Sequence, residues 1–387
     1  MVSRMSELDS AVHAALATVI DPEIHRPITD LGMVESIAVD PSGLAAITVL
    51  LTIAGCPLAS TIESDVNTAV AAVPGVTGVN LTLGTMNDEQ RAELKKQLRG
   101  GREDRDIPFA KPDSLTQVIL VASGKGGVGK SSVTVNLAMA LAAQGRTVGV
   151  LDADIYGHSI PQMLGLTEAM PTSVDGMIMP VPSMGLRVIS IGMLKQSRDQ
   201  VIAWRGPILD RALQQFLADV YWGDLDFLIV DLPPGTGDVA LSLGQKLPNA
   251  EVIVVTTPQQ ASAEVAERAG TMASMLEQKV IGVVENMAYL EVTCPHCNQN
   301  HRVNVFGSGG GAEVAGTLST RLGYEVPLLA EIPMDPALAA AGDLGVPLVA
   351  TDPDRPASAA LTALATRLAA RTRNLVGRKL GLTPVQG

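Results

Sequence analysis

The fold is decided by residues 117–131, QVILVASGKGGVGKS, and by the apolar segment SVTVNLAMALAAQG that follows them. The run QVILVA predicts a buried strand, and the segment after the loop predicts a helix. Between them stands Gly, four residues and Gly-Lys-Ser, the pattern of a loop that binds nucleotide phosphates. Its glycines let backbone N–H groups turn toward phosphate oxygens, and the helix start adds the positive end of its dipole. The predicted phosphate-binding residues are Gly124, Lys125, Gly126, Gly127, Val128, Gly129, Lys130, Ser131 and Ser132.

Side chains in this loop and at the ends of two later strands have the chemistry that a magnesium nucleotide needs. Lys130 is expected to pair with the β- and γ-phosphates, and the Ser131 hydroxyl is expected to bind Mg²⁺. The runs VGVLDAD and FLIVD are predicted strands that end in carboxylates. We expect Asp154 to orient the attacking water or to hold the magnesium shell, and Asp231 to contact Mg²⁺ through water. The alternative role for either aspartate is a helix cap. The segment LPPGTGD, directly after Asp231, is a candidate switch loop that senses the γ-phosphate.

Apolar runs continue through the second part of the chain and alternate with helical stretches. They lie at 118–122, 148–151, 227–230, 252–256 and 280–284. Nearly continuous apolar runs of this length are typical of strands buried on both faces of a parallel sheet. The sequence therefore predicts an α/β domain with a doubly wound, mostly parallel sheet, in which ligands bind at the carboxyl ends of the strands.

A smaller domain is predicted ahead of this one. Its helical and strand patterns follow each other in the order α-β-β-α-β, which gives a small α+β domain. The segment GGREDRDIPFAKPDS has the glycine, proline and charge that are typical of a linker. The predicted division is 1–99 for the small domain, 100–114 for the linker, 115–372 for the phosphate-loop domain and 373–387 for a basic tail.

The composition excludes several classes of protein. Forty acidic residues against 28 basic ones give a net charge of −12, which argues against a nucleic-acid partner. Three cysteines in 387 residues cannot form a disulfide framework. The N-terminal segment lacks the apolar core of a signal sequence, and the uncharged run 41–62 contains the prolines and glycines of a strand and loop. We therefore expect a soluble, cytoplasmic protein without membrane attachment.

The basic C-terminal segment allows two interpretations. After Asp354 the chain has arginines and a lysine but no acidic residue, and a basic amphipathic helix can lie on anionic lipid. Leu361, Leu364 and Leu368 have helical spacing, however, and such a stripe more often packs a terminal helix onto its own domain. We expect packing on the domain.

The cysteine pair of Cys294-Pro295-His296-Cys297 is a candidate metal site. Two thiolates cannot complete a site that needs four ligands. Two chains related by a twofold axis would supply four thiolates to one cluster. A zinc site that also uses His296 and His301 would close within one chain, and a redox dithiol is a third alternative. The residues alone leave all three open.

Lys125 makes the loop resemble the deviant Walker A motif of the MinD/ParA/nitrogenase-iron-protein class. Members of that class dimerise around the nucleotide, and the extra lysine reaches the phosphates of the partner subunit. The resemblance implies a catalytic Lys125 and a homodimer. The alternative is a solvated surface lysine.

Five segments occur in the order seen in the Mrp/ApbC/Nbp family of iron–sulfur carrier ATPases, which the chain resembles over roughly 115–345: GKGGVGKS, DADIYGHSIP, DLPPGTGD, VVENMAYLEVTCPHC and FGSGGG. DPEI, DLGMV and TIAGCPLAS resemble the small iron–sulfur assembly domain that is often fused to such proteins. The resemblance implies an ATP-hydrolysing carrier that assembles a cluster and transfers it to apoproteins. It also implies iron–sulfur assembly proteins as partners. It implies ATP and Mg²⁺ as ligands, and a 4Fe–4S cluster that bridges a dimer through Cys294 and Cys297.

Further site residues follow from the same resemblance. Asn286 and Pro333 are implied as adenine contacts, and Cys56 as a residue that handles clusters. Cys56 also stands where a strand passes into a helix, and a helix N-terminus is expected to lower the pKa of its thiol; the alternative is a small buried hydrophobic residue. The sequence departs from the family at His158, where proline is usual, and near Glu264, where an aspartate is frequent.

Two functions of other classes compete with the carrier. A MinD- or ParA-like positioning ATPase would use the nucleotide site but gives the CPHC insertion no role. An NTPase with a structural zinc site would use both the nucleotide site and the CPHC insertion.

Overall fold

The computed structural model describes residues 7–53, 56, 58–99, 106–111, 113–154, 157, 159–194, 206–235, 237–259, 268 and 278–371. Several predictions made from the sequence lie outside these residues. They concern residues 100–105 and 112 of the linker, His158, the position near Glu264 and the tail from 373 onward.

The described chain divides into two compact units. The first contains residues up to 106 together with 171–182 and 219–223, and the second contains the remainder. The sequence did not predict that two short segments from the second half of the chain join the first unit.

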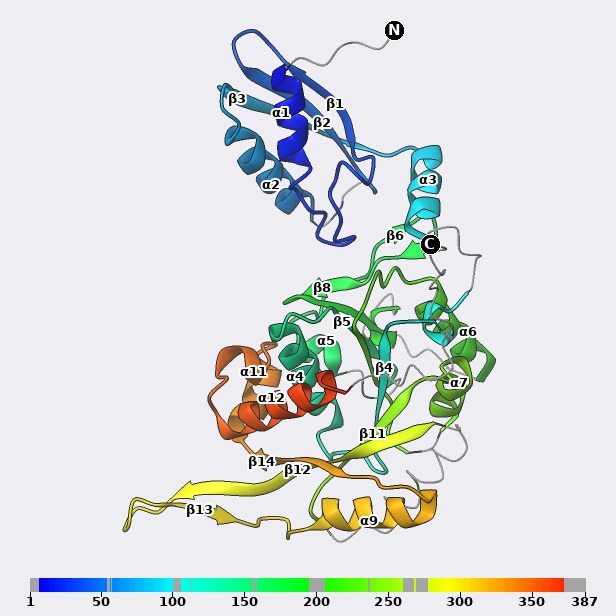
Figure 1. Cartoon of the computed structure of the whole chain (residues 1–387), viewed down its shortest axis with the longest axis vertical. Helices are drawn as coiled ribbons and strands as arrows, with labels where there is room; N and C mark the ends of the chain where they lie inside the picture. The colour runs from blue at the N-terminus through cyan, green and yellow to red at the C-terminus, as the bar shows by residue number, and fades with distance from the viewer. Residues whose placement is uncertain are drawn as a thin grey trace, which may run out of the picture. The chain divides into compact units, whose positions relative to one another are not determined.

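The first unit is built on a three-stranded sheet. Its elements are α1 (Glu7–Leu16), β1 (Val34–Val39), β2 (Leu44–Leu51), α2 (Ala59–Ala71), β3 (Gly78–Thr85) and α3 (Asp88–Arg99). β1 is antiparallel to β2, and β2 is parallel to β3. Ala45, Ile47 and Val49 of β2 are buried while Leu44 is exposed, so one face of the sheet packs and the other faces solvent. The two helices α1 and α2 cover the packed face (Figure 1). The predicted α+β order is confirmed.

A short hairpin completes the core of this unit. It is formed by β6 (Ser173–Val174) and β7 (Met177–Ile178). Val174, Met177 and Met179 are buried in the same hydrophobic cluster as the interior of the small domain. Thr172 also donates a hydrogen bond to the buried Glu23 carboxylate, at 3.0 Å from Oε1.

The second unit is organised around a mostly parallel sheet. In the described residues its order is β13-β12-β11-β4-β10-β5-β9-β8, with β14 paired to β12. The strands are β4 (Gln117–Ala122), β5 (Val148–Asp152), β8 (Val181–Ser183), β9 (Leu186–Ser190), β10 (Phe227–Asp231), β11 (Glu251–Thr256), β12 (Lys279–Thr293), β13 (Asn300–Val303) and β14 (Leu328–Met334). The helices are α4 (Lys130–Ala143), α5 (Ile160–Met163), α6 (Gly206–Ala218), α7 (Asp238–Lys246), α9 (Gly310–Leu322), α10 (Pro336–Asp343), α11 (Leu348–Thr351) and α12 (Pro356–Ala369). Short 3-10 turns lie at Pro108–Ala110 and Ile191–Leu194. This is the predicted doubly wound α/β fold.

The register of the central strands positions the predicted site. β10 runs parallel between β4 and β5, and Asp231 is paired with Val121 on one side and Asp152 on the other. Because the carboxyl ends of parallel strands meet at one edge of the sheet, the two aspartates lie beside the loop that follows β4.

The terminal helix α12 packs on its own domain, as expected. Leu361, Leu364 and Leu368 are all buried against α4 and β14. Arg355 and Arg371 form ion pairs with Asp335 and Glu251. These arginines are therefore engaged within the domain. In the part of the chain that the structure describes, no helix combines the length and hydrophobicity needed to cross a bilayer.

Candidate nucleotide site and metal centre

The loop between β4 and α4 has the backbone that phosphate binding requires. Gly127 and Gly129 both have φ of +78°, in the left-handed region that favours glycine. A side chain on Gly129 would collide with Asn286 Nδ2, whereas one on Gly126 or Gly127 would meet no atom within 4 Å. The loop is therefore packed from behind at Gly129 and open at the two preceding glycines, as a phosphate cradle needs.

Lys130 begins α4 and forms an ion pair with Asp231. Its Nζ lies 2.7 Å from Oδ1, and both side chains are buried. Within the described residues this buried Nζ has the ion pair but no hydrogen bond of good geometry. A buried ammonium with unused donors fits an anionic ligand, because an unsatisfied buried donor is costly. The predicted role of Lys130 toward phosphate is consistent with this position.

Two hydroxyl groups fix the Asp231 carboxylate. Ser131 Oγ donates to Oδ2 at 2.5 Å, and Thr134 Oγ1 donates to Oδ1 at 2.8 Å. Ser131 and Asp231, the predicted magnesium residues, are thus adjacent, and their oxygen atoms are of the type that Mg²⁺ prefers. Sequence reasoning missed Thr134, although its position one helical turn after Lys130 was a usable signal.

Asp152 is the last residue of β5, and Asp154 follows the strand. Complete burial and the neighbouring charge of Asp231 raise the pKa of Asp152 to about 8. Asp152 accepts hydrogen bonds from Ser190 Oγ at 2.9 Å and from the Asp154 backbone N–H at 3.1 Å. Asp154 is also buried, and its Oδ1 accepts the Gly157 N–H at 3.0 Å. The catalytic role of Asp154 stays a prediction.

Segments that follow β10 and β11 contact the entrance of the loop. Gly235, in the predicted switch segment, donates its backbone N–H to Ser123 O at 2.9 Å. Lys125 Nζ donates to Gln259 Oε1 at 3.1 Å, and Arg268 donates to Gly124 O at 3.2 Å. A ligand that moves the loop would therefore change these hydrogen bonds and act directly on both segments.

Asn286 joins the loop to β12. Its Nδ2 donates to Val128 O at 2.9 Å, and its side chain is buried. Pro333 lies on the neighbouring strand β14, where Asn286 is paired with Ile332. The two residues predicted to contact adenine are thus on adjacent strands beside the loop, and their contact with the base stays a prediction.

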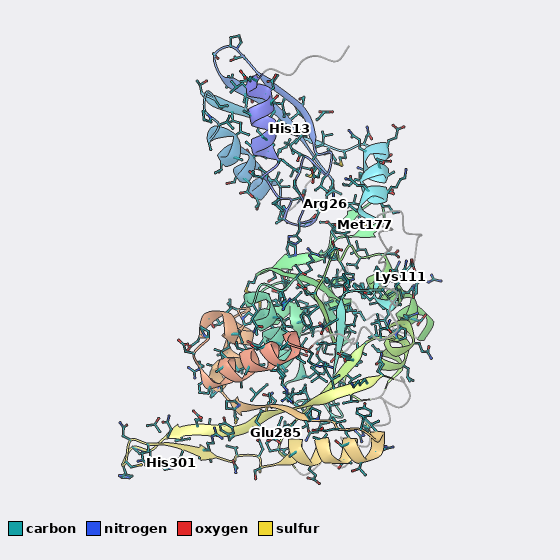
Figure 2. All side chains as sticks on the ribbon, in the orientation of Figure 1. His13, Arg26, Lys111, Met177, Glu285 and His301 are labelled. Atoms are coloured by element: carbon teal, nitrogen blue, oxygen red, sulfur yellow. The ribbon has the colours of Figure 1, made fainter. Side chains whose placement is uncertain are left out.

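β12 continues from this point into the hairpin that carries the cysteines. Its first half packs in the sheet, and Leu290–Thr293 pairs with β13. Met287 has φ of +56° where the two parts meet. Figure 2 shows Glu285 where β12 lies beside α9 and His301 far out on the hairpin. The buried Glu285 carboxylate accepts the backbone N–H of Gly311 at the start of α9, a contact that sequence reasoning missed.

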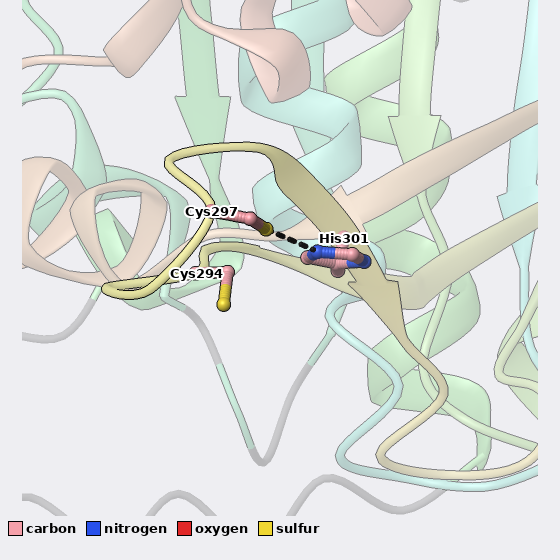
Figure 3. Close-up of side chains that lie close together, drawn as sticks. All are labelled: Cys294, Cys297 and His301. Carbon is pink, nitrogen blue, oxygen red and sulfur yellow. Dashed lines mark hydrogen bonds between the residues drawn. The ribbon is translucent and has the colours of Figure 1, made fainter.

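The turn of the hairpin brings three potential ligands together (Figure 3). Donor atoms of Cys294, Cys297 and His301 all lie within 4.8 Å of one another. Hydrogen bonds from the backbone N–H groups of Cys297 and His296, and then from the Cys297 thiol, lower the pKa of Cys294. Among the described residues His296 is not part of this group, so the donor set is Cys₂His and not the Cys₂His₂ set considered from the sequence.

The two faces of the hairpin differ in chemistry. Pairing of Leu290 with Val303 and of Val292 with His301 places these residues on the face that also carries Cys294. Val292 and Val303 are 40% and 45% exposed, so this face is apolar and accessible. The opposite face is polar, with Arg302 over the Tyr289 ring at 4.1 Å.

Cys56, in the first unit, differs from its prediction. The thiol is buried, and burial raises its pKa, with further contributions from the charges of Glu23 and Asp21. α2 begins only at Ala59, three residues later. The expected lowering of the pKa by the helix N-terminus was therefore wrong, because desolvation and two nearby carboxylates outweigh it. A role in cluster handling stays a prediction.

We expect Cys56 to be the slowest of the three cysteines to react with iodoacetamide in folded, metal-free protein. Its rate should be at least about tenfold below those of Cys294 and Cys297, because the thiolate is the reactive form. Competitive labelling with mass spectrometry measures the three rates, and labelling in denaturant provides the control in which they converge. If Cys56 were the fastest of the three cysteines to label in the folded protein, its burial and raised pKa would be contradicted.

Together, the loop, the buried Lys130–Asp231 pair and the parallel sheet define a P-loop NTPase. The model of the NUBPL iron-transfer P-loop NTPase family matches residues 114–369, and the model of an iron-sulfur cluster assembly protein matches residues 9–98. The chain belongs to this family of P-loop NTPases and has a fused assembly domain.

Individual relatives agree with this assignment. An iron-sulfur cluster carrier protein of Mycobacterium tuberculosis is 56% identical over 99% of both chains. One from Deinococcus radiodurans is 42% identical over 94% of this chain and 95% of its own length. Among solved structures, a nucleotide-binding protein of Archaeoglobus fulgidus, in complex with ADP and with cobalt found, is 39% identical. That match covers 63% of this chain and 92% of the other, with a TM-score of 0.51.

Proposed function

We propose that this protein is an ATP-dependent iron–sulfur cluster carrier that assembles a cluster on its cysteine hairpin and passes it to apoproteins. The observation that carries this proposal is the pair of half-buried Cys294 and exposed Cys297 on a P-loop NTPase. Relatives of nearly the same length are named iron-sulfur cluster carrier proteins, which supports it. Iron–sulfur assembly proteins, as suppliers of the cluster, and apoproteins, as its recipients, are the implied partners.

The cluster is proposed to bridge two copies of the chain. One chain provides two thiolates at the hairpin, and a 4Fe–4S cluster generally takes four. A twofold axis through the cluster supplies the other pair, and it would also cover the apolar face around Val292 and Val303.

ATP hydrolysis is proposed to act as a conformational switch for cluster retention. Asn286 contacts the loop carbonyl of Val128, and Cys294 directly follows the end of the same strand, eight residues after Asn286. A change of loop position on hydrolysis therefore has a continuous backbone path to the hairpin.

The two rival functions account for less of the chain. A positioning ATPase leaves the cysteine hairpin without a role, and Arg355 and Arg371, which lipid would need, are paired with acids. A purely structural zinc site favours four enclosed protein ligands, whereas Cys297 and His301 are exposed. We also propose a cytoplasmic location, because free thiols and a labile cluster require a reducing compartment.

We expect Lys125→Ala to bind Mg-ATP but to hydrolyse it about 100-fold more slowly, since the missing charge would act on the transition state of the partner subunit. Within its own chain the Lys125 ammonium donates a hydrogen bond to Gln259. Among the described contacts it has no acidic partner. Calorimetry measures binding, and phosphate release at saturating ATP measures turnover.

Gln259→Ala is the matched control for loss of the hydrogen bond within the chain, and it should hydrolyse ATP far better than Lys125→Ala. Wild-type turnover by Lys125→Ala would remove the case for a composite site between two chains.

A further inference from the structure

The three donors at the hairpin have the spacing of ligands to a single ion. Cys297 Sγ lies 3.4 Å from His301 Nε2, and Cys294 Sγ lies within 4.8 Å of both. A tetrahedral ion with bonds of about 2.3 Å to sulfur and about 2.0 Å to nitrogen holds those two atoms about 3.5 Å apart. Ligands on separate irons of a cluster lie further apart, so this arrangement matches one ion more closely than it matches a cluster.

The hairpin brings His301 to the cysteines for a structural reason. His301 is paired with Val292, two residues before Cys294, and side chains two apart on a strand share a face. Asn298, with φ of +53°, turns the chain back, and its N–H donates to Cys294 O at 2.9 Å. This turn places Cys297 beside the His301 ring (Figure 3).

We propose that Cys294, Cys297 and His301 of one chain form a mononuclear site for a thiophilic divalent ion, zinc(II) or iron(II). Thiolate and imidazole ligands select such ions, and binding releases the two thiol protons to solvent. Three protein ligands leave a fourth tetrahedral position open to water, the coordination that distinguishes open zinc sites from closed structural ones.

The same two thiolates cannot serve this ion and a bridging cluster at once. The site therefore competes with the cluster of the proposed function, with one ion per chain in place of one cluster per two chains. His301 is the residue that distinguishes the two states, since the cluster receives four thiolates without it. This competition rests on the proposed function, whereas the ion site itself does not.

Cobalt(II) titration of reduced, metal-free, full-length protein tests the ion site. Charge-transfer absorption from thiolate and intense visible bands report four-coordinate cobalt. We expect saturation at about one cobalt per chain, with the mass of a monomer by light scattering. His301→Ala should bind cobalt at least about 100-fold more weakly, with shifted visible bands, because one of three ligands is lost.

His296→Ala is the matched control, since His296 stands in the same turn but outside the donor group, and it should titrate like the wild type. Equal affinity of His301→Ala and wild type would overturn the proposal. Saturation at half an ion per chain would also overturn it, because it would indicate bridging by cysteines alone.

Cluster reconstitution separates this proposal from the carrier function. His301→Ala should still retain a cluster, and about one equivalent of zinc(II) per chain should block reconstitution in the wild type. The variant should require about 100-fold more zinc for the same block. Loss of the cluster in His301→Ala would contradict the proposal that His301 binds only the single ion and not the cluster. Retention of the cluster by the cysteine variants would instead contradict the carrier function and leave the cobalt result standing.

Discussion

Lys130→Ala is expected to weaken Mg-ATP binding by about 100-fold, equivalent to about 2.8 kcal/mol. Lys130 Nζ is buried in the loop, close to Asp231, where its positive charge can pair with the phosphates. Isothermal titration calorimetry with ATP, with and without Mg²⁺, measures the loss. Lys246→Ala is the matched control, because it removes a lysine paired to an acid, Asp210, that lies away from the loop.

Ser131→Ala keeps the variant series interpretable if Lys130→Ala destabilises the fold. Lys130→Ala leaves the Asp231 carboxylate buried without its cation, which is costly. Ser131→Ala retains that ion pair and should lose mainly the Mg²⁺-dependent part of the affinity. Wild-type ATP affinity in both variants would contradict the nucleotide site.

Cys294→Ala and Cys297→Ala are each expected to lose the iron–sulfur cluster almost completely while they keep the ATP affinity of the wild type. Each substitution would remove two of four ligands from a symmetric dimer, because both chains carry it. Iron and sulfide assays after anaerobic reconstitution measure the loss, and calorimetry measures ATP binding.

Cys56→Ala is the matched control for these two variants. It removes the third cysteine of the chain, which is buried in the other unit, and it should retain the cluster. Loss of the cluster in Cys56→Ala together with retention in Cys294→Ala would place the cluster in the small domain and contradict the hairpin site.

The adjacency of Lys130, Ser131 and Asp231 could be predicted from the sequence because the geometry is local. The phosphate loop is one continuous segment, and Asp231 ends a strand adjacent to the strand that leads into that loop. In a parallel sheet the carboxyl ends of neighbouring strands meet, so a motif and a strand end are enough to place two side chains together. The α/β fold could be predicted for the same reason.

Features that depend on contacts distant in sequence could not be predicted. Burial of Cys56 beside Glu23 reversed the expected direction of its pKa shift, and no local pattern reveals such desolvation. The addition of residues 171–182 to the core of the small domain has no sequence signal. At the hairpin, His296 and His301 were equal candidates until strand pairing placed only His301 with the thiols.

The most direct test of the proposed carrier function is the iron and acid-labile sulfide content of the full-length protein after anaerobic reconstitution, with the mass of the same fraction measured by light scattering. A cluster that bridges two hairpins predicts about four irons and four sulfides for every two chains, in a species with the mass of a dimer. A species that holds metal but no sulfide, with the mass of a monomer under the same conditions, would contradict it.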